Sequence, residues 1–141
     1  MSRSIDLHKL STAHTNETVI DGKSSGLLEL GEAVTWRAKH LGFYQTLTSK
    51  ITVFRYPDYF EDAMIQGIFK SFRHEHHFTE QNGTTTMVDI FDYTSPLGFI
   101  GKLADVLFLR RYMTNFLHKR NATIKEFSEN GRYTEILNTQ N

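Results

Sequence analysis

The hydrophobic pattern of this chain changes its period once, close to residue 95. Before that point, apolar and polar residues alternate along short runs, as they do in strands with one buried face. These runs lie at residues 17–21, 32–40, 43–55, 59–68, 72–78 and 87–93. The turns between them are too short for parallel crossovers, so the pattern predicts about six strands in one antiparallel meander.

After residue 95 the apolar residues recur with the spacing of a helix. Pro96 suits the first helical position with Ser95 as its cap, so we expect one long helix over 96–130. A meander with one wide apolar face and one long apolar helix predicts an α+β fold in which a curved sheet wraps the helix. We expect a single domain with a partial helix at 1–14, the meander at 17–95, the C-terminal helix at 96–130 and a tail at 131–141, whose last four residues look poorly anchored.

The last two predicted strands carry the most informative residues. Asn82-Gly83 is a strong signal for a two-residue type I′ turn, because both central residues of that turn need a positive φ. Pairing counted outward from this turn places His76 opposite Asp89 and His74 opposite Phe91 on one face. A shift of one residue would remove this arrangement. Polar groups on the apolar face of a sheet need partners or a wet cavity, so the pairing predicts a polar cluster inside the fold.

Composition narrows the possible functions. The chain has 141 residues, of which 39% are hydrophobic and 23% charged, as in an ordinary soluble domain. The 16 basic and 16 acidic side chains balance, which argues against nucleic acid as a partner. The absence of cysteine excludes disulfides, thiolate metal sites and a cysteine nucleophile. No apolar run is long enough for a membrane span, and the first residues are too polar for a signal peptide, so we expect a cytoplasmic protein without stable membrane insertion.

Several motifs together resemble a known family. They are GEAVTWRA at 31–38, FRHEH at 72–76, DIFDY at 89–93, SPLG at 95–98, DVLFLRRYM at 105–113 and KRN at 119–121. As a set they resemble the SRPBCC superfamily, which includes START domains, polyketide cyclases and birch-pollen-allergen-like proteins. The likeness is to its stand-alone bacterial ligand-binding members, some of which carry a cell division inhibitor label.

This resemblance implies a helix-grip fold, in which a bent antiparallel sheet wraps a C-terminal helix and leaves an elongated apolar cavity. Members of the family usually open with a strand before the first helix, whereas this chain begins inside that helix at residues 2–8. The loss of that strand would expose a sheet edge, so we expect a homodimer that pairs through it, or a less stable domain.

The sequence leaves three interpretations of the polar cluster open. His76 opposite Asp89 could act as a general base whose tautomer is set by the carboxylate. The same pair could instead be a buried hydrogen-bonded pair with no chemical role. His74, His76 and Asp89 could also supply three metal ligands, but alternation sends the neighbouring Glu75 and His77 to the opposite face. We favour the buried pair and expect neither a metal nor a cofactor.

Aromatic residues make up 13% of the chain, and most of them suit an ordinary core. The resemblance implies that a subset lines a ligand pocket. The predicted ligand-binding residues are Trp36, Phe72, His74, His76, Asp89, Phe91, Phe108 and Tyr112. The basic pairs at 110–111 and 119–120 are typical of a solvated helix face, with an anionic surface as the alternative.

The leading hypothesis is therefore a protein that binds or carries a hydrophobic small molecule, such as a lipid, an isoprenoid or a polyketide-like compound. The alternative is a cyclase, aromatase or hydrolase that uses His76 and Asp89 in the same cavity. No nucleophile or oxyanion site accompanies that pair in the sequence, so we favour the binding hypothesis over the enzyme hypothesis.

Overall fold

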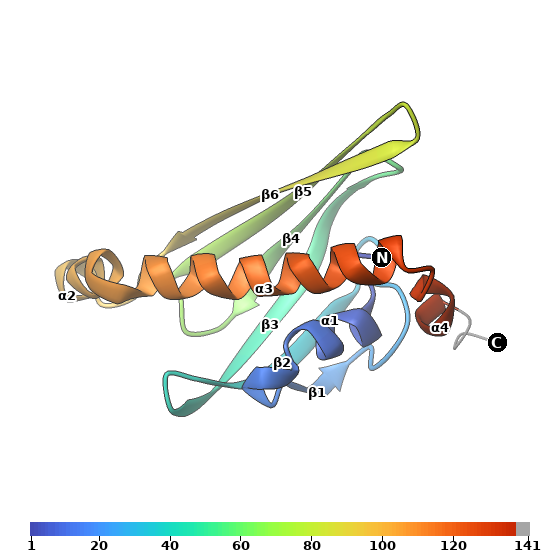
Figure 1. The fold of residues 1–141 in the computed structure, drawn as a ribbon. Coiled ribbons are helices and arrows are strands. Elements are labelled where there is room, and N and C mark those ends of the chain that lie inside the picture. The colour runs from blue at the N-terminus through green and yellow to red at the C-terminus, as the bar shows by residue number, and fades with distance from the viewer. Residues whose placement is uncertain (138–141) are drawn as a thin grey trace.

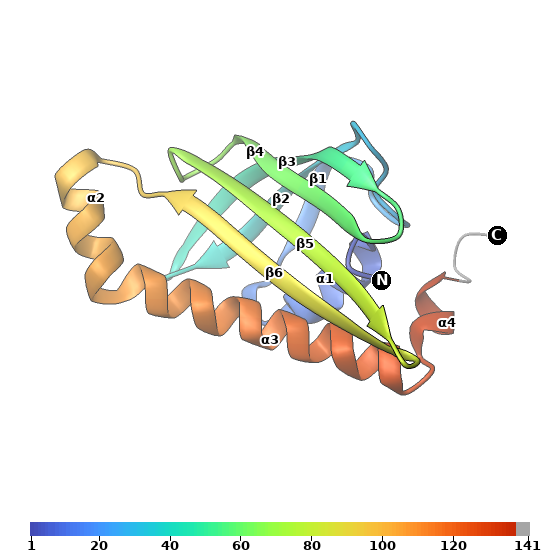
Figure 2. The ribbon, with the colours of Figure 1, turned by 90° about the horizontal axis from the view of Figure 1, so that it is seen from above.

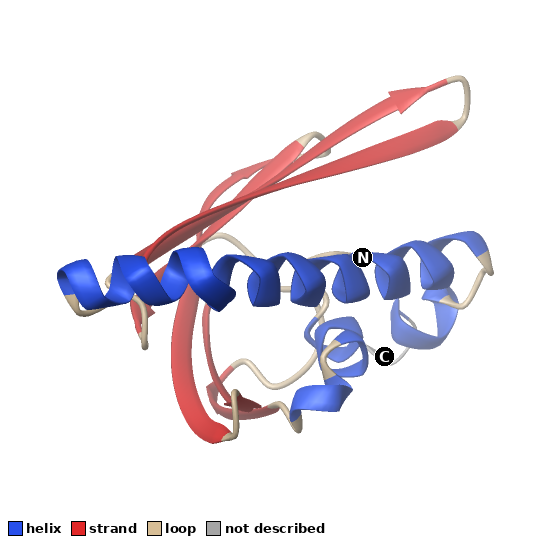
Figure 3. Ribbon diagram, turned by 60° about the vertical axis from the view of Figure 1, so that its left-hand side comes forward, coloured by secondary structure: helices blue, strands red, loops and turns tan. Residues whose placement is uncertain are grey.

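A computed structural model of the protein describes residues 1–137, with only the backbone at Glu135 and Leu137. In chain order, the elements are α1 (Ile5–Ser11), η1 (Ala13–Thr15), β1 (Thr18–Gly22), β2 (Ala33–His40), β3 (Phe43–Arg55), β4 (Tyr59–Gln66), β5 (Ser71–Gln81), β6 (Thr84–Thr94), α2 (Gly98–Ala104), η2 (Asp105–Leu109), α3 (Arg110–Glu129) and α4 (Tyr133–Leu137). The six strands form one antiparallel sheet in sequence order, and the sheet curves around α3 (Figure 1). The helices lie on one side of this sheet (Figure 3). The predicted α+β helix-grip architecture is confirmed.

The hairpin of β5 and β6 has the predicted register. His76 lies opposite Asp89, and His74 lies opposite Phe91. At the turn, Asn82 has φ 54° and Gly83 has φ 75°, as a type I′ turn requires. The local turn therefore sets which side chains of these two strands face the helix.

The C-terminal helix begins later than predicted and is not uniform. Leu97 has φ 63°, a left-handed conformation that no helix accommodates, and α2 starts at Gly98 without a side-chain cap. The prediction of Pro96 at the first helical position is therefore wrong. The chain folds back so tightly here that a Cβ at Gly101 would lie 1.6 Å from the Pro96 carbonyl oxygen. Residues 105–109, which form η2, have the wider π-helical turn, and α3 continues from Arg110 to Glu129.

The short helix α1 joins the sheet to the C-terminal helix. Ser4 caps it by accepting a hydrogen bond from the Leu7 amide at 3.2 Å. On one face, Ile5 packs with Val34 and Trp36 of β2. On the other face, Leu7 packs in a cluster with Ile124, Phe127 and Ile136. Among the described side chains, two apolar clusters therefore lie on either side of α1.

The start of the C-terminal helix carries apolar side chains that no other element covers. Phe99, Val106 and Leu107 are 82%, 71% and 71% exposed. Figure 2 shows the reason, since α2 projects past the end of the sheet. The apolar stripe that the sequence shows along this helix is therefore buried against the fold only in the later part, at Ile124 and Phe127.

The segment predicted as a tail contains a helix. Residues 133–137 form α4, and the Ile136 side chain is buried in the cluster with Leu7. The predicted loose end at residues 138–141 lies outside the described residues. Within the described part, no helix combines the length and apolar character that crossing a membrane requires.

Candidate functional site

Three neighbouring strands bring two histidines and two aspartates to the face of the sheet that α3 covers. On β5, His74 and His76 are buried, whereas Arg73 before them is exposed and Glu75 between them is half-buried, as the alternation of a strand requires. His74 lies opposite Asp62 of β4, and His76 lies opposite Asp89 of β6. Each histidine therefore has a carboxylate on a neighbouring strand.

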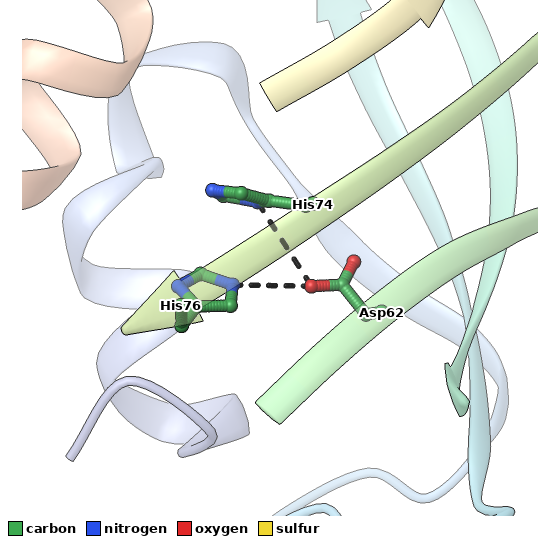
Figure 4. Close-up of side chains that lie close together, drawn as sticks. All are labelled: Asp62, His74 and His76. Atoms are coloured by element: carbon green, nitrogen blue, oxygen red, sulfur yellow. Dashed lines mark hydrogen bonds and ion pairs between the residues drawn. The ribbon is translucent and has the colours of Figure 1, made fainter. Parts of the chain in front are cut away.

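The four side chains form one connected cluster. The Nδ1 atom of His76 lies 2.7 Å from Oδ1 of Asp89, and its Nε2 atom lies 3.2 Å from Oδ1 of Asp62. The His74 ring lies between the same two carboxylates, with Nδ1 3.9 Å from Asp62 and Nε2 3.6 Å from Asp89. Figure 4 shows both rings directed at the Asp62 carboxylate. The predicted contact of His76 with Asp89 is thus part of a larger arrangement.

Asp62 is a member of the cluster that sequence reasoning missed. It lies in β4 two residues from buried Phe60, on the face of the strand that points inward. A carboxylate that alternates with apolar residues in this way is a recognisable signal of a buried acid. The signal was available in the sequence, but no short turn signal between β4 and β5 sets the register that places Asp62 opposite His74.

Arg120 of α3 is the second member that the sequence did not identify. Its Nη1 atom lies 3.3 Å from Oδ2 of Asp89, and its side chain is only 6% exposed. The prediction that the 119–120 pair lies on a solvated face is therefore wrong for Arg120. Its spacing of four residues from both Phe116 and Ile124 places it on their face of the helix, which is the signal that could have revealed it.

The cluster holds defined protonation states. Burial alone would raise the pKa of Asp62, but the hydrogen bond with His76 and the charge of nearby groups outweigh it and leave that pKa below its ordinary value. Burial acts on Asp89 in the same way and is outweighed more strongly by the two histidines and Arg120, so its pKa lies well below the usual range. Burial lowers the pKa of His74, and the contact with Asp89 opposes this only in part. Near neutral pH the two carboxylates are ionised and His74 is neutral.

A cavity of about 130 Å³ lies against this cluster. Its size is close to that of the ~150 Å³ engineered cavity known to hold benzene. The polar side chains in its wall include Glu17, Asp62, His74, His76 and Arg120. We call this space the polar compartment.

A second cavity of about 240 Å³ lies under α2 and the start of α3. Its wall is almost entirely apolar, and we call it the apolar compartment. The two compartments share five wall residues, namely Glu17, Trp36, Leu47, Phe69 and Met113. The shared wall residues place the two compartments next to each other between sheet and helix.

The structure divides the predicted ligand-binding residues between these compartments. Those in the wall of the polar compartment are Phe72, His74, His76 and Phe91, those in the wall of the apolar compartment are Phe108 and Tyr112, and Trp36 belongs to both. Asp89 belongs to neither wall and reaches the cavity only through the two imidazoles. In the apolar compartment, the Tyr112 hydroxyl lies 2.7 Å from Nδ1 of His40, which gives this region one polar point.

Glu17 lies where the two compartments meet. Its carboxylate is 2.9 Å from Nε2 of His8, and its side chain is 6% exposed. Burial alone would raise the pKa of Glu17, but the charge of His8 and hydrogen bonds with His8 and Thr12 leave it below its ordinary value. The wall that the two compartments share therefore carries the negative charge of Glu17 near neutral pH.

This lowered pKa predicts a pH dependence of stability. The folded state holds the Glu17 proton more weakly than the unfolded state, so ionised Glu17 stabilises the fold above the ordinary pKa of 4.5 and this contribution is lost as the pH falls through the folded value. Urea denaturation from about pH 6 to 3 should show a smaller acid loss in Glu17→Gln than in the wild type. Glu129→Gln, at an exposed side chain, should follow the wild type. If the free energy of unfolding falls equally with decreasing pH in the wild type and in Glu17→Gln, this prediction is wrong.

Among the described residues, one group of three side chains is close enough to hold a metal ion, namely Asp62, His74 and His76. The sequence pointed to Asp89 as the third ligand. The structure instead places Asp89 against Arg120 and the His76 Nδ1 atom, on the other side of the imidazole from Asp62.

Comparisons with known proteins add little to this description. No protein-family model matches the chain, and no curated protein matches it. Among solved structures, the crystal structure of Ara h 8.0201 is similar, with 11% sequence identity, a TM-score of 0.47, and coverage of 86% of this chain and 89% of that chain. A likeness at this level carries no argument about function, so the site has to be interpreted from its own geometry.

Proposed function

We propose that this protein binds a hydrophobic small molecule that carries a polar group, in the space between the sheet and the C-terminal helix. The observation that carries this proposal is that an apolar compartment shares five wall residues with a compartment whose wall contains ionised and neutral hydrogen-bonding groups. An apolar cavity with a few convergent polar groups is the usual form of a small-molecule site. Lipids, isoprenoids and polyketide-like compounds have this combination of an apolar body and a polar end.

The exposed residues of the apolar compartment support the proposal. Leu97, Ile100 and Phe108 belong to its wall and are 79%, 70% and 46% exposed. Covering apolar surface contributes about 25 cal/mol per Å² removed from water. A bound apolar molecule would cover part of these side chains, so binding would also relieve their exposure to water.

The polar compartment would orient the ligand. The Asp62 carboxylate belongs to the cavity wall and is 20% exposed, whereas both ring nitrogens of His76 already lie against carboxylates. A hydroxyl group placed there would donate a hydrogen bond to Asp62, while the apolar body extends past Trp36. This arrangement needs no cofactor.

The proposal predicts that filling the apolar compartment abolishes binding. Ala104 belongs to its wall, and Ala104→Phe places a ring in that space. Titration with N-phenylnaphthylamine, followed by dye fluorescence and by the emission of Trp36, the single tryptophan, should show affinity reduced about tenfold or more. Ala122→Phe is the matched control, because Ala122 is exposed on α3 and belongs to neither compartment. Equal affinities in all three proteins, or no saturable binding by the wild type, would refute the proposal.

The enzyme remains the second candidate, because His76 belongs to the cavity wall and lies 2.7 Å from Asp89. A histidine held by a carboxylate beside a cavity can transfer protons to or from a bound molecule. Mass spectrometry of the intact protein purified from its own host would identify a co-purified molecule. With that molecule as substrate, His76→Ala should lose orders of magnitude in rate if the protein is an enzyme, and only some affinity if it is a carrier.

Two further proposals concern the surroundings of the protein. The edge strands β1 and β6 each have one neighbour in the sheet, and pairing through such an edge would produce the predicted homodimer. Sedimentation equilibrium tests this, and a compact monomer at all concentrations would remove it. Location in the cytoplasm and membership of the SRPBCC superfamily, with its cell division label, stay predictions of the sequence.

A further inference from the structure

Two imidazole nitrogens and one carboxylate oxygen meet at one point in the polar compartment. Oδ1 of Asp62 lies 3.2 Å from Nε2 of His76 and 3.9 Å from Nδ1 of His74. The ligand atoms of these three residues all lie within 4.8 Å of one another. We infer that Asp62, His74 and His76 bind a divalent metal ion of the zinc class.

The second carboxylate explains why lone pairs face this point. Each histidine directs its other ring nitrogen at Asp89, His76 at 2.7 Å and His74 at 3.6 Å. A neutral imidazole carries a single N–H. If both rings direct that N–H to Asp89, the nitrogen that faces Asp62 carries a lone pair in each. Histidines that bind metals almost always donate the opposite N–H to a carboxylate or a carbonyl group. The 2.7 Å contact of His76 with Asp89 has this form, whereas His74 lies 3.6 Å from the same carboxylate, beyond hydrogen-bond distance.

Of the two carboxylates in the cluster, Asp62 is the one whose charge a metal cation could balance. Asp89 has Arg120 at 3.3 Å, so its negative charge is already balanced by a buried guanidinium. Asp62 lies against the two histidines and, among the described residues, forms no ion pair with a lysine or an arginine. A cation at this point would balance its charge. The competing occupant is a proton shared between His76 and Asp62.

The donor set selects the class of metal. Two imidazole nitrogens and one carboxylate oxygen suit zinc and similar transition metals, whereas magnesium and calcium prefer oxygen ligands. With bonds of about 2.0–2.2 Å, a tetrahedral zinc site places its ligand atoms roughly 3.4 Å apart, between the two distances found here. Three protein ligands leave a coordination position open, and the polar compartment borders all three residues. A water molecule or a polar ligand group can occupy that position.

The test is a titration with zinc alone. Protein stripped of metal by a chelator is titrated with Zn²⁺ by calorimetry in a buffer that does not bind zinc. The wild type should bind one ion per chain, and His74→Gln and His76→Ala should each weaken binding at least about a hundredfold. His77→Ala is the matched control, because His77 lies on the same strand, points to the opposite face and bonds to Glu75. It should keep wild-type affinity.

Further measurements keep the result clear if a variant folds poorly. Circular dichroism and thermal denaturation without zinc identify variants that have lost the fold. Asp89→Asn retains all three ligands and should weaken zinc binding about tenfold to a hundredfold, since it changes the group that orients the imidazoles. Because it also removes the charge that pairs with Arg120, its fold is checked in the same way. Cobalt substituted for zinc should give the absorption bands of nitrogen and oxygen coordination in the wild type and lose them in His76→Ala.

Several outcomes would overturn the inference. Absence of a saturable zinc site in the wild type means that a shared proton occupies the cluster. Loss of binding in His77→Ala, with retention in folded His74→Gln and His76→Ala, means that zinc binds elsewhere on the surface. Neither result affects the dye titration with Ala104→Phe, so failure of the metal site and failure of the proposed function are distinguishable.

Discussion

Replacing Arg120 with methionine is expected to lower the free energy of unfolding by about 3–5 kcal/mol, the usual cost of removing one partner of a buried ion pair. The Arg120 and Asp89 side chains are 6% and 5% exposed, so little water can replace the lost contact. Arg120 also donates to the Ser2 carbonyl oxygen at 3.3 Å and thereby links α3 to the segment before α1. Methionine keeps a long unbranched side chain, so urea denaturation of Arg120→Met reports mainly the lost charge and its hydrogen bonds.

Two comparisons make this prediction specific. Arg110→Met removes a guanidinium that is 73% exposed and 3.7 Å from Asp105, and it should cost about 1 kcal/mol or less. The double variant Arg120→Met with Asp89→Asn removes both charges and should be more stable than the sum of the single effects implies. Strict additivity, or a loss below about 1 kcal/mol for Arg120→Met, would show that the ion pair does not stabilise the fold.

Leu7→Ala should lower the free energy of unfolding by about 2–5 kcal/mol, which is the range for truncating a buried leucine. The Leu7 side chain is 1% exposed and packs in the cluster of Ile124, Phe127 and Ile136. This cluster holds the last turns of α3 and the short α4 against α1. The loss should appear both in urea denaturation and as faster amide hydrogen exchange at the end of α3.

Leu10→Ala is the matched control on the same helix. The Leu10 side chain is 52% exposed, so its truncation should change the free energy of unfolding by about 0.5 kcal/mol or less. Equal effects of the two substitutions would mean that α1 is not packed between the sheet and the C-terminal helix. That result would also remove the support of the polar compartment, since Ile5 and His8 of α1 belong to its wall.

The register of β5 and β6 could be predicted because its determinants are neighbours in sequence. The type I′ turn at Asn82-Gly83 aligns the two strands, and alternation then decides which residues face inward. His76 and Asp89 meet for this reason alone. The same local rule failed at Pro96, because the left-handed conformation of Leu97 and the tight approach at Gly101 depend on how α2 folds back over the preceding segment.

The cluster itself could be predicted only in part. Asp62 and Arg120 were each visible as a charged residue with apolar neighbours at strand or helix spacing. Their partners were not visible, because Asp62 reaches the histidines across a strand pair with no short turn signal to set its register. Arg120 contacts Asp89 only because α3 crosses the sheet next to the part of β6 that contains Asp89.

By itself, the sequence determined the order of the elements, the antiparallel meander and the inward direction of His74, His76 and Asp89, because periodicity and turn geometry act between residues close along the chain. The tertiary structure alone decided which carboxylate faces both imidazoles, that Arg120 is buried, and that the cavity has a polar and an apolar compartment. These features depend on the curvature of the sheet and the path of the helix across it. Both are set by the packing of the whole core, and no local pattern encodes them.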